Sequence, residues 1–105
     1  MTNMDLKIAR ELKQRLSNVV RLIDFKIFGS RARGDADEYS DMDVFIEVEI
    51  VNRDTVDRIR DIAWEVGFEH LIHISPVIFT RHDIEDTPLR SSPIVRNIAA
   101  EGVGV

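Results

Sequence analysis

The chain has 105 residues, of which 44% are hydrophobic and 31% are charged, and it contains no cysteine. This length is typical of one domain, so we expect residues 1–105 to form a single domain. The missing cysteines exclude a disulfide framework, a thiol nucleophile and a cysteine-ligated zinc site. A formal net charge of −5 argues against a dedicated duplex-DNA-binding domain, which would carry a basic excess.

The apolar runs are only a few residues long, far short of the ~20 residues that a helix needs to cross a bilayer. We expect no signal peptide after Met1, because a charged amphipathic stretch begins almost at once. We therefore expect a cytoplasmic protein with no membrane segment.

Hydrophobic periodicity predicts three helices and three strands. In chain order they are a helix over Asp5–Ser17, strands over Leu22–Phe28 and Met42–Ile50, a helix over Asp54–Val66, a strand over Leu71–Phe79 and a helix over Pro93–Ala100. Gly67 is placed to end the second helix, and Pro76 puts the last strand at a sheet edge or a bulge. This order predicts an α/β or α+β fold, with a small sheet and helices over one face.

The segment Phe28–Gly34 is a candidate phosphate-binding turn. A strand ends at Phe28, Gly29 lets the chain turn, and a helical turn starting at Ser30 would leave backbone N–H groups free for an anion. The Ser30 hydroxyl can donate to a phosphate oxygen, and Arg31 or Arg33 can add positive charge. The alternative is an ordinary turn with solvated arginines. The segment is not a Walker A loop, because Asp35 and Ala36 stand where that motif needs Lys-Ser/Thr.

The pair Asp41 and Asp43 is a candidate divalent-metal site and catalytic centre. The two residues are two apart on a strand, so both carboxylates leave from one face while Val44 and Ile46 anchor the other face in the core. Carboxylate oxygens suit Mg²⁺, which usually completes its coordination with water and substrate phosphates. The alternative is two solvated acids at a strand start. An EF-hand does not fit, because Ser40 or Ile46 would occupy its glycine position.

Together, Gly29-Ser30-x-Ala32-Arg33-Gly34 and Ser40-Asp41-x-Asp43 resemble the nucleotidyltransferase superfamily of DNA polymerase beta. The chain is most similar to the minimal single-domain nucleotidyltransferases, and Ser92–Ile98 with Glu101-Gly102 extends the resemblance toward the end of the chain. The resemblance implies a mixed sheet with flanking helices. It also implies transfer of a nucleoside monophosphate from a nucleoside triphosphate to a hydroxyl, with Gly29 and Ser30 on the triphosphate and Asp41 and Asp43 on magnesium.

One feature of that superfamily is missing from the expected place. A third carboxylate usually comes from a later neighbouring strand, but the Leu71–Phe79 segment contains no Asp or Glu. His73 could act as a base in its place, or could be a partly buried structural residue. The acidic substitutes are Glu47, Glu69 and Asp83.

Two functions remain open at this point. The first is Mg²⁺-dependent transfer of AMP from ATP to an acceptor hydroxyl. The resemblance implies a helical HEPN-type protein as partner, as acceptor, as toxin or as both, and a homodimer is also possible. The second is a nucleotide-binding module that acts by masking its partner, as the missing carboxylate suggests. Trp64 is expected to pack in the core or at its rim rather than to stack on a base.

Overall fold

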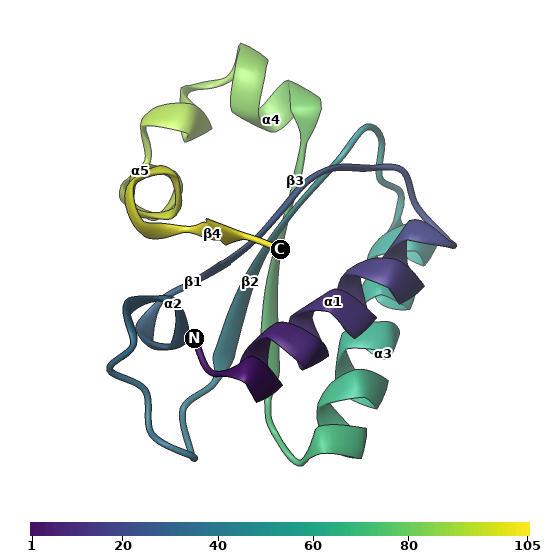
Figure 1. Cartoon of the computed structure of the whole chain (residues 1–105). Helices are drawn as coiled ribbons and strands as arrows, with labels where there is room; N and C mark the ends of the chain where they lie inside the picture. The colour runs from purple at the N-terminus through teal and green to yellow at the C-terminus, as the bar shows by residue number, and fades with distance from the viewer.

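The computed structural model describes all 105 residues, Met1–Val105, and contains one four-stranded sheet with the order β3-β2-β1-β4 (Figure 1). Strand β1 is antiparallel to β2 and to β4, whereas β2 and β3 are parallel. The elements are α1 (Asn3–Ser17), β1 (Leu22–Phe28), α2 (Ser30–Arg33), β2 (Met42–Val48), α3 (Arg53–His70), β3 (Ile74–Thr80), α4 (Arg81–Asp86), the 3-10 helix η1 (Pro88–Ser91), α5 (Pro93–Glu101) and β4 (Val103–Gly104). This mixed sheet with flanking helices confirms the expected fold class.

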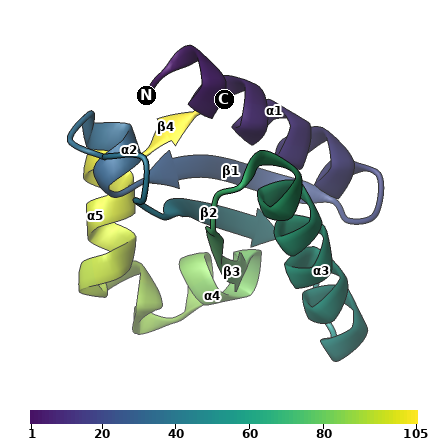
Figure 2. The ribbon, with the colours of Figure 1, turned by 90° about the horizontal axis from the view of Figure 1, so that it is seen from below.

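Helices α1 and α3 pack on one face of the sheet, while α4, η1 and α5 lie on the other side (Figures 1 and 2). The sequence predicts helices over one face only, so the second layer of helices corrects that prediction. The core lies between the sheet and the α1/α3 layer, where the alternate residues Val44, Ile46 and Val48 of β2 are at most 1% exposed. The opposite face of β2 carries Asp43, and it is therefore the face of the candidate site.

Helix α1 begins where its sequence provides a cap. The Thr2 hydroxyl accepts from the Asp5 N–H, and the Asp5 side chain accepts from the Thr2 N–H. This reciprocal capping box satisfies two backbone donors that a helix start otherwise leaves free. Its buried stripe of Ile8, Leu12 and Leu16 recurs every four residues and faces the core.

The sequence predicts that the second long helix ends near Val66, but α3 continues to His70. A Cβ at Gly67 would lie 2.6 Å from the Ile72 carbonyl oxygen. Gly67 is therefore an interior helix residue that admits the returning chain, rather than the end of the helix. Leu71 caps the end of the helix and adopts the left-handed conformation with φ 58°.

Strand β3 lies at an edge of the sheet, as Pro76 predicts. It starts three residues later than expected, and β2 ends two residues earlier, at Val48. Helix α5 begins as its sequence allows, with Ser92 as its cap and Pro93 at its first position. Helix α4, η1 and β4 were not predicted, although Thr80 and Asp83 form a capping box that the sequence displays.

None of the helices combines the length and the apolar character that a membrane crossing requires.

Candidate active site

The turn after β1 has the shape that the sequence predicts. Gly29 adopts φ 75° and ψ −155°, a conformation that L side chains rarely take, and α2 begins at Ser30. Gly34 ends this short helix with φ 85°, and its N–H donates to the Ser30 carbonyl. The first N–H groups of a helix have no partner within the helix, so those at the start of α2 can receive an anion.

Gly29 lies directly against Asp43. A Cβ on Gly29 would come within 2.4 Å of Asp43 Oδ2. The backbone register also pairs Phe28 with Asp43, which fixes the end of β1 beside the start of β2. The glycine turn and the carboxylate, 14 residues apart in the sequence, are thus parts of one site.

The electrostatics at Asp43 suit a cation. Burial, and then the charge of Asp41, raise the pKa of Asp43, while Arg33 and His73 lower it. No group of the protein donates a hydrogen bond to the Asp43 carboxylate, and the one ion-pair contact of Asp41 is to His73, with 3.4 Å between Oδ1 and Nδ1. A divalent cation would relieve both the repulsion between the two carboxylates and the desolvation of the partly buried Asp43, so these residues fit such an ion.

Arg31 departs from its expected role at a phosphate. Its side chain is buried, with the residue 8% exposed, and Nη1 donates to Asp5 Oδ1 at 2.7 Å. Nε and Nη2 both donate to the Ser40 carbonyl, at 3.1 and 2.7 Å. The guanidinium is therefore engaged in joining α1 to the segment before Asp41, and we assign Arg31 a structural role.

Arg33 is the exposed arginine of the turn. Its guanidinium contacts Asp35 at 3.2 Å and Glu101 at 3.1 Å. The hydrogen bond and charge of Asp35 raise the pKa of Arg33, so the side chain stays charged. Exposed ion pairs of this kind are weak, so Arg33 can exchange an acidic partner for a phosphate.

The expected position of a third carboxylate is occupied by other residues. The register places Ser75 beside Asp43 and Val77 beside Phe45. Glu47 lies four residues beyond Asp43, about 13 Å along the strand. Glu69 contacts Arg15, and Asp83 caps α4. Neither of them makes an ion pair or hydrogen bond with Asp41 or Asp43. Of the residues considered as substitutes, His73 alone contacts the pair.

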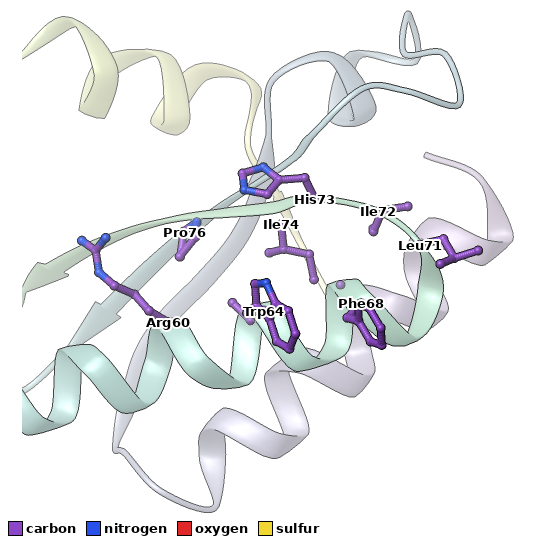
Figure 3. A pocket seen from close by; sticks show the side chains of 10 residues that line it. Arg60, Trp64, Phe68, Leu71, Ile72, His73, Ile74 and Pro76 are labelled. Atoms are coloured by element: carbon purple, nitrogen blue, oxygen red, sulfur yellow. The ribbon is translucent and has the colours of Figure 1, made fainter.

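Trp64 is expected in the core or at its rim, and the structure places it outside the core. It is 65% exposed and stacks on Phe68, also 65% exposed, with 5.2 Å between the ring centroids. The two rings line a hollow of about 440 Å³ between α3 and β3 (Figure 3). Arg60, Trp64 and Phe68 are spaced by four residues along α3, so they lie on one face of the helix. This spacing can be read from the sequence.

The fold and these contacts define a class of small α/β protein, in which an anion-receiving glycine turn lies against paired carboxylates on the next strand. A family model described as a nucleotidyltransferase domain matches residues 6–103. The chain therefore belongs to the nucleotidyltransferase domain family, which confirms the resemblance read from its two motifs. Nucleotidyltransferases generally use a nucleoside triphosphate and a divalent metal ion.

Two relatives from Methanocaldococcus jannaschii are similar in sequence. "Putative protein adenylyltransferase MJ1305" is 38% identical over 66 residues, which is 60% of this chain and 45% of that protein. "Putative protein adenylyltransferase MJ0141" is 37% identical over 79 residues, which is 72% of this chain and 80% of that protein. The match to the first relative thus spans less than half of that protein's length.

Two solved structures share the fold. One is a crystal structure titled as a putative nucleotidyltransferase from Sulfolobus solfataricus, with TM-score 0.55, 18% identity, and coverage of 96% of this chain and 78% of that chain. The other is titled as a toxin-antitoxin with AMP-PNP, with TM-score 0.60, 17% identity, and coverage of 90% and 69%. At these identities the likeness concerns the fold alone.

Proposed function

We propose that the chain transfers a nucleoside monophosphate, AMP from ATP, to an acceptor hydroxyl, with Mg²⁺ as the divalent ion. The close approach of Gly29 to Asp43 carries the proposal, because it joins an anion-receiving turn to a carboxylate pair in which burial and mutual repulsion raise the pKa of Asp43. The names of the two Methanocaldococcus jannaschii relatives support adenylyl transfer in particular.

Each residue of the site has a part in this reaction. The N–H groups at the start of α2 and the Ser30 hydroxyl bind the triphosphate beside Gly29, and Arg33 adds charge. Asp41 and Asp43 hold the divalent ion, which when bound neutralises phosphate charge and favours attack by the hydroxyl. The acceptor oxygen bonds to the α-phosphorus, the bond from that phosphorus to the bridging oxygen breaks, and pyrophosphate leaves with the electron pair. The hydroxyl proton passes to water.

We further propose that a second protein completes the site. Asp41 and Asp43 line neither the hollow at Trp64 nor the one beside Arg31. A helical HEPN-type partner would cover the carboxylates and supply the acceptor hydroxyl, with this chain as the antitoxin of the pair. One structural neighbour is a toxin-antitoxin, which supports the toxin-antitoxin part of this proposal.

Titration calorimetry with Mg²⁺ and a non-hydrolysable ATP analogue tests the site. We expect magnesium-dependent binding to the native chain and its loss in Asp41→Asn/Asp43→Asn. The matched control is Asp57→Asn/Asp61→Asn, which removes the same two charges from exposed positions of α3. Equal binding by the native chain and the Asp41/Asp43 variant would contradict the proposal.

A second candidate function is a binding module that masks its partner without modifying it. The absence of an Asp or Glu beside Asp43 on β3 favours it, since Ser75 occupies that register position. Mass spectrometry of the partner separates the two functions. Enzymatic transfer adds the mass of one adenylyl group, which is AMP less one water, and the addition needs ATP and both aspartates. Masking leaves the partner's mass unchanged and is retained by the double variant.

A further inference from the structure

We propose that His73 is a third protein ligand of the divalent ion at Asp41 and Asp43, and that it shifts the site's preference from Mg²⁺ toward transition metals such as Co²⁺. This inference rests on the proposed function, because it concerns the same ion. Strand β3 contains no Asp or Glu, and His73, directly before it, offers an imidazole in place of a carboxylate.

The backbone fixes His73 beside Asp41. The Met42 N–H donates to the His73 carbonyl at 2.9 Å, one residue beyond the Met42–Ile74 pair of the parallel β2–β3 ladder. Because side chains alternate along a strand, His73 lies on the same face as Asp41 and Asp43. Figure 3 shows the His73 ring on the opposite side of β3 from Ile74 and Trp64.

The side-chain spacing is that of two ligands of one ion. His73 Nδ1 lies 3.4 Å from Asp41 Oδ1, longer than a usual hydrogen bond. Transition-metal ions such as Zn²⁺ take nitrogen and oxygen ligands at ~2.1 Å. Two ligands of such a tetrahedral ion therefore lie roughly 3.4 Å apart. His73 has no other polar side-chain partner, and its side chain is 71% exposed, so the imidazole is free to bind an ion.

The ligand chemistry sets the metal preference. Carboxylate and water oxygens suit Mg²⁺, whereas imidazole nitrogen suits later first-row metals, whose affinity also rises along the series toward Cu²⁺. A site with two carboxylates and one imidazole should therefore discriminate less in favour of Mg²⁺ than a site with three carboxylates.

A different group of possible ligands must be removed before the measurement. Glu11 of α1 and Glu69 and His70 of α3 offer ligand atoms within 4.8 Å of one another. The structure explains them as ion pairs, since His70 Nε2 lies 2.6 Å from Glu11 and Glu69 contacts Arg15. All titrations are therefore made in a His70→Gln background.

The experiment compares Co²⁺ and Mg²⁺ binding in the presence of the non-hydrolysable ATP analogue. Calorimetry gives both dissociation constants, and the visible absorption of bound Co²⁺ reports nitrogen ligation. The variants are His73→Ala and His73→Asp. The control is His82→Ala, because His82 is similarly exposed, at 73% of its side chain, and has its own carboxylate partner, Asp86, at 3.1 Å.

We expect His73→Ala to weaken Co²⁺ binding by about tenfold or more, with a smaller effect on Mg²⁺, and to change the Co²⁺ spectrum. His73→Asp should move the preference back toward Mg²⁺, and His82→Ala should change neither constant. Unchanged Co²⁺ affinity and spectrum in His73→Ala would overturn the inference. If the Asp41→Asn/Asp43→Asn variant nevertheless loses the metal, the proposed function stands. If that variant also keeps the metal, or if the His70→Gln parent binds none, both fail.

Discussion

At Gly29, a single missing side chain lets two parts of the site meet. Gly29→Ala would combine an unfavourable backbone conformation with a Cβ 2.4 Å from Asp43 Oδ2, so Asp43 must move. We expect a loss of about 1–3 kcal/mol in the free energy of unfolding, and loss of nucleotide binding in calorimetry.

Gly34→Ala is the control for this prediction, because Gly34 has a similarly positive φ of 85° but nothing within 4 Å of its Cβ position. It should carry the strain without the effect on binding. Normal nucleotide affinity in Gly29→Ala would show that the position of Asp43 is not critical.

Glu47 is a buried carboxylate that works against the fold at neutral pH. It is 8% exposed, and burial, followed by the charges of Asp24 and Glu85, raises its pKa. A pKa raised on folding means that the folded state binds the proton more readily. The stability of the protein therefore falls as pH rises from the ordinary carboxyl range through the raised pKa of Glu47.

We expect Glu47→Gln to unfold at higher urea concentration than the native chain at pH 7, because the amide carries no charge to desolvate. The advantage should shrink as the pH is lowered toward 4. A variant that is less stable than the native chain at pH 7 would show that Glu47 makes a favourable charged contact.

At the scale of elements, local sequence predicts those whose pattern is regular. Strand β1 has the predicted bounds, and α1 and α5 differ from prediction by one or two residues, because caps such as Thr2 and Ser92 act locally. The end of α3 could not be predicted in this way. Gly67 is required by the chain that returns at Ile72, which is a tertiary contact rather than a local signal.

The same contact reverses a usual substitution effect. Gly→Ala inside a helix ordinarily stabilises by about 1 kcal/mol. In Gly67→Ala the new Cβ would lie 2.6 Å from the Ile72 carbonyl, and such overpacking costs about 1–3 kcal/mol. We expect net destabilisation in urea unfolding. Ala99→Gly, on the exposed side of α5, measures the effect of helix propensity alone. A Gly67→Ala variant more stable than the native chain would mean that the chain at Ile72 can shift to make room for the Cβ.

The candidate site was predictable in part, because only some of its contacts are encoded by local spacing. The motif residues Gly29, Asp41 and Asp43 are readable from spacing, and the structure brings them together. The position of Arg31 was not readable, because its partner Asp5 lies 26 residues earlier. An arginine next to a phosphate-binding turn has the same local sequence whether it faces solvent or the interior.

Over the whole molecule, the Asp5–Arg31 pair ties the first helix to the chain that presents the carboxylates. Both residues are less than 10% exposed, and Arg31 also donates to the Ser40 carbonyl, directly before Asp41. Removing one member leaves a buried charge alone, so we expect Arg31→Ala to lose about 3–5 kcal/mol of unfolding free energy.

Arg33→Ala serves as the comparison, since its exposed pairs should contribute at most about 1 kcal/mol. Urea unfolding measures both variants. If Arg31→Ala kept its stability and lost only nucleotide affinity, Arg31 would be a phosphate ligand as the sequence suggested.

The exposure of Trp64 decides what its fluorescence can report. It is the only tryptophan of the chain and is already largely in water when the protein is folded. Its emission should therefore change little in wavelength on denaturation, so circular dichroism is the better probe of folding. A protein that covers α3 would instead move the indole into an apolar environment and shift its emission to the blue. The intrinsic fluorescence of this chain is thus a sensor of occupancy on α3 rather than of the folded state.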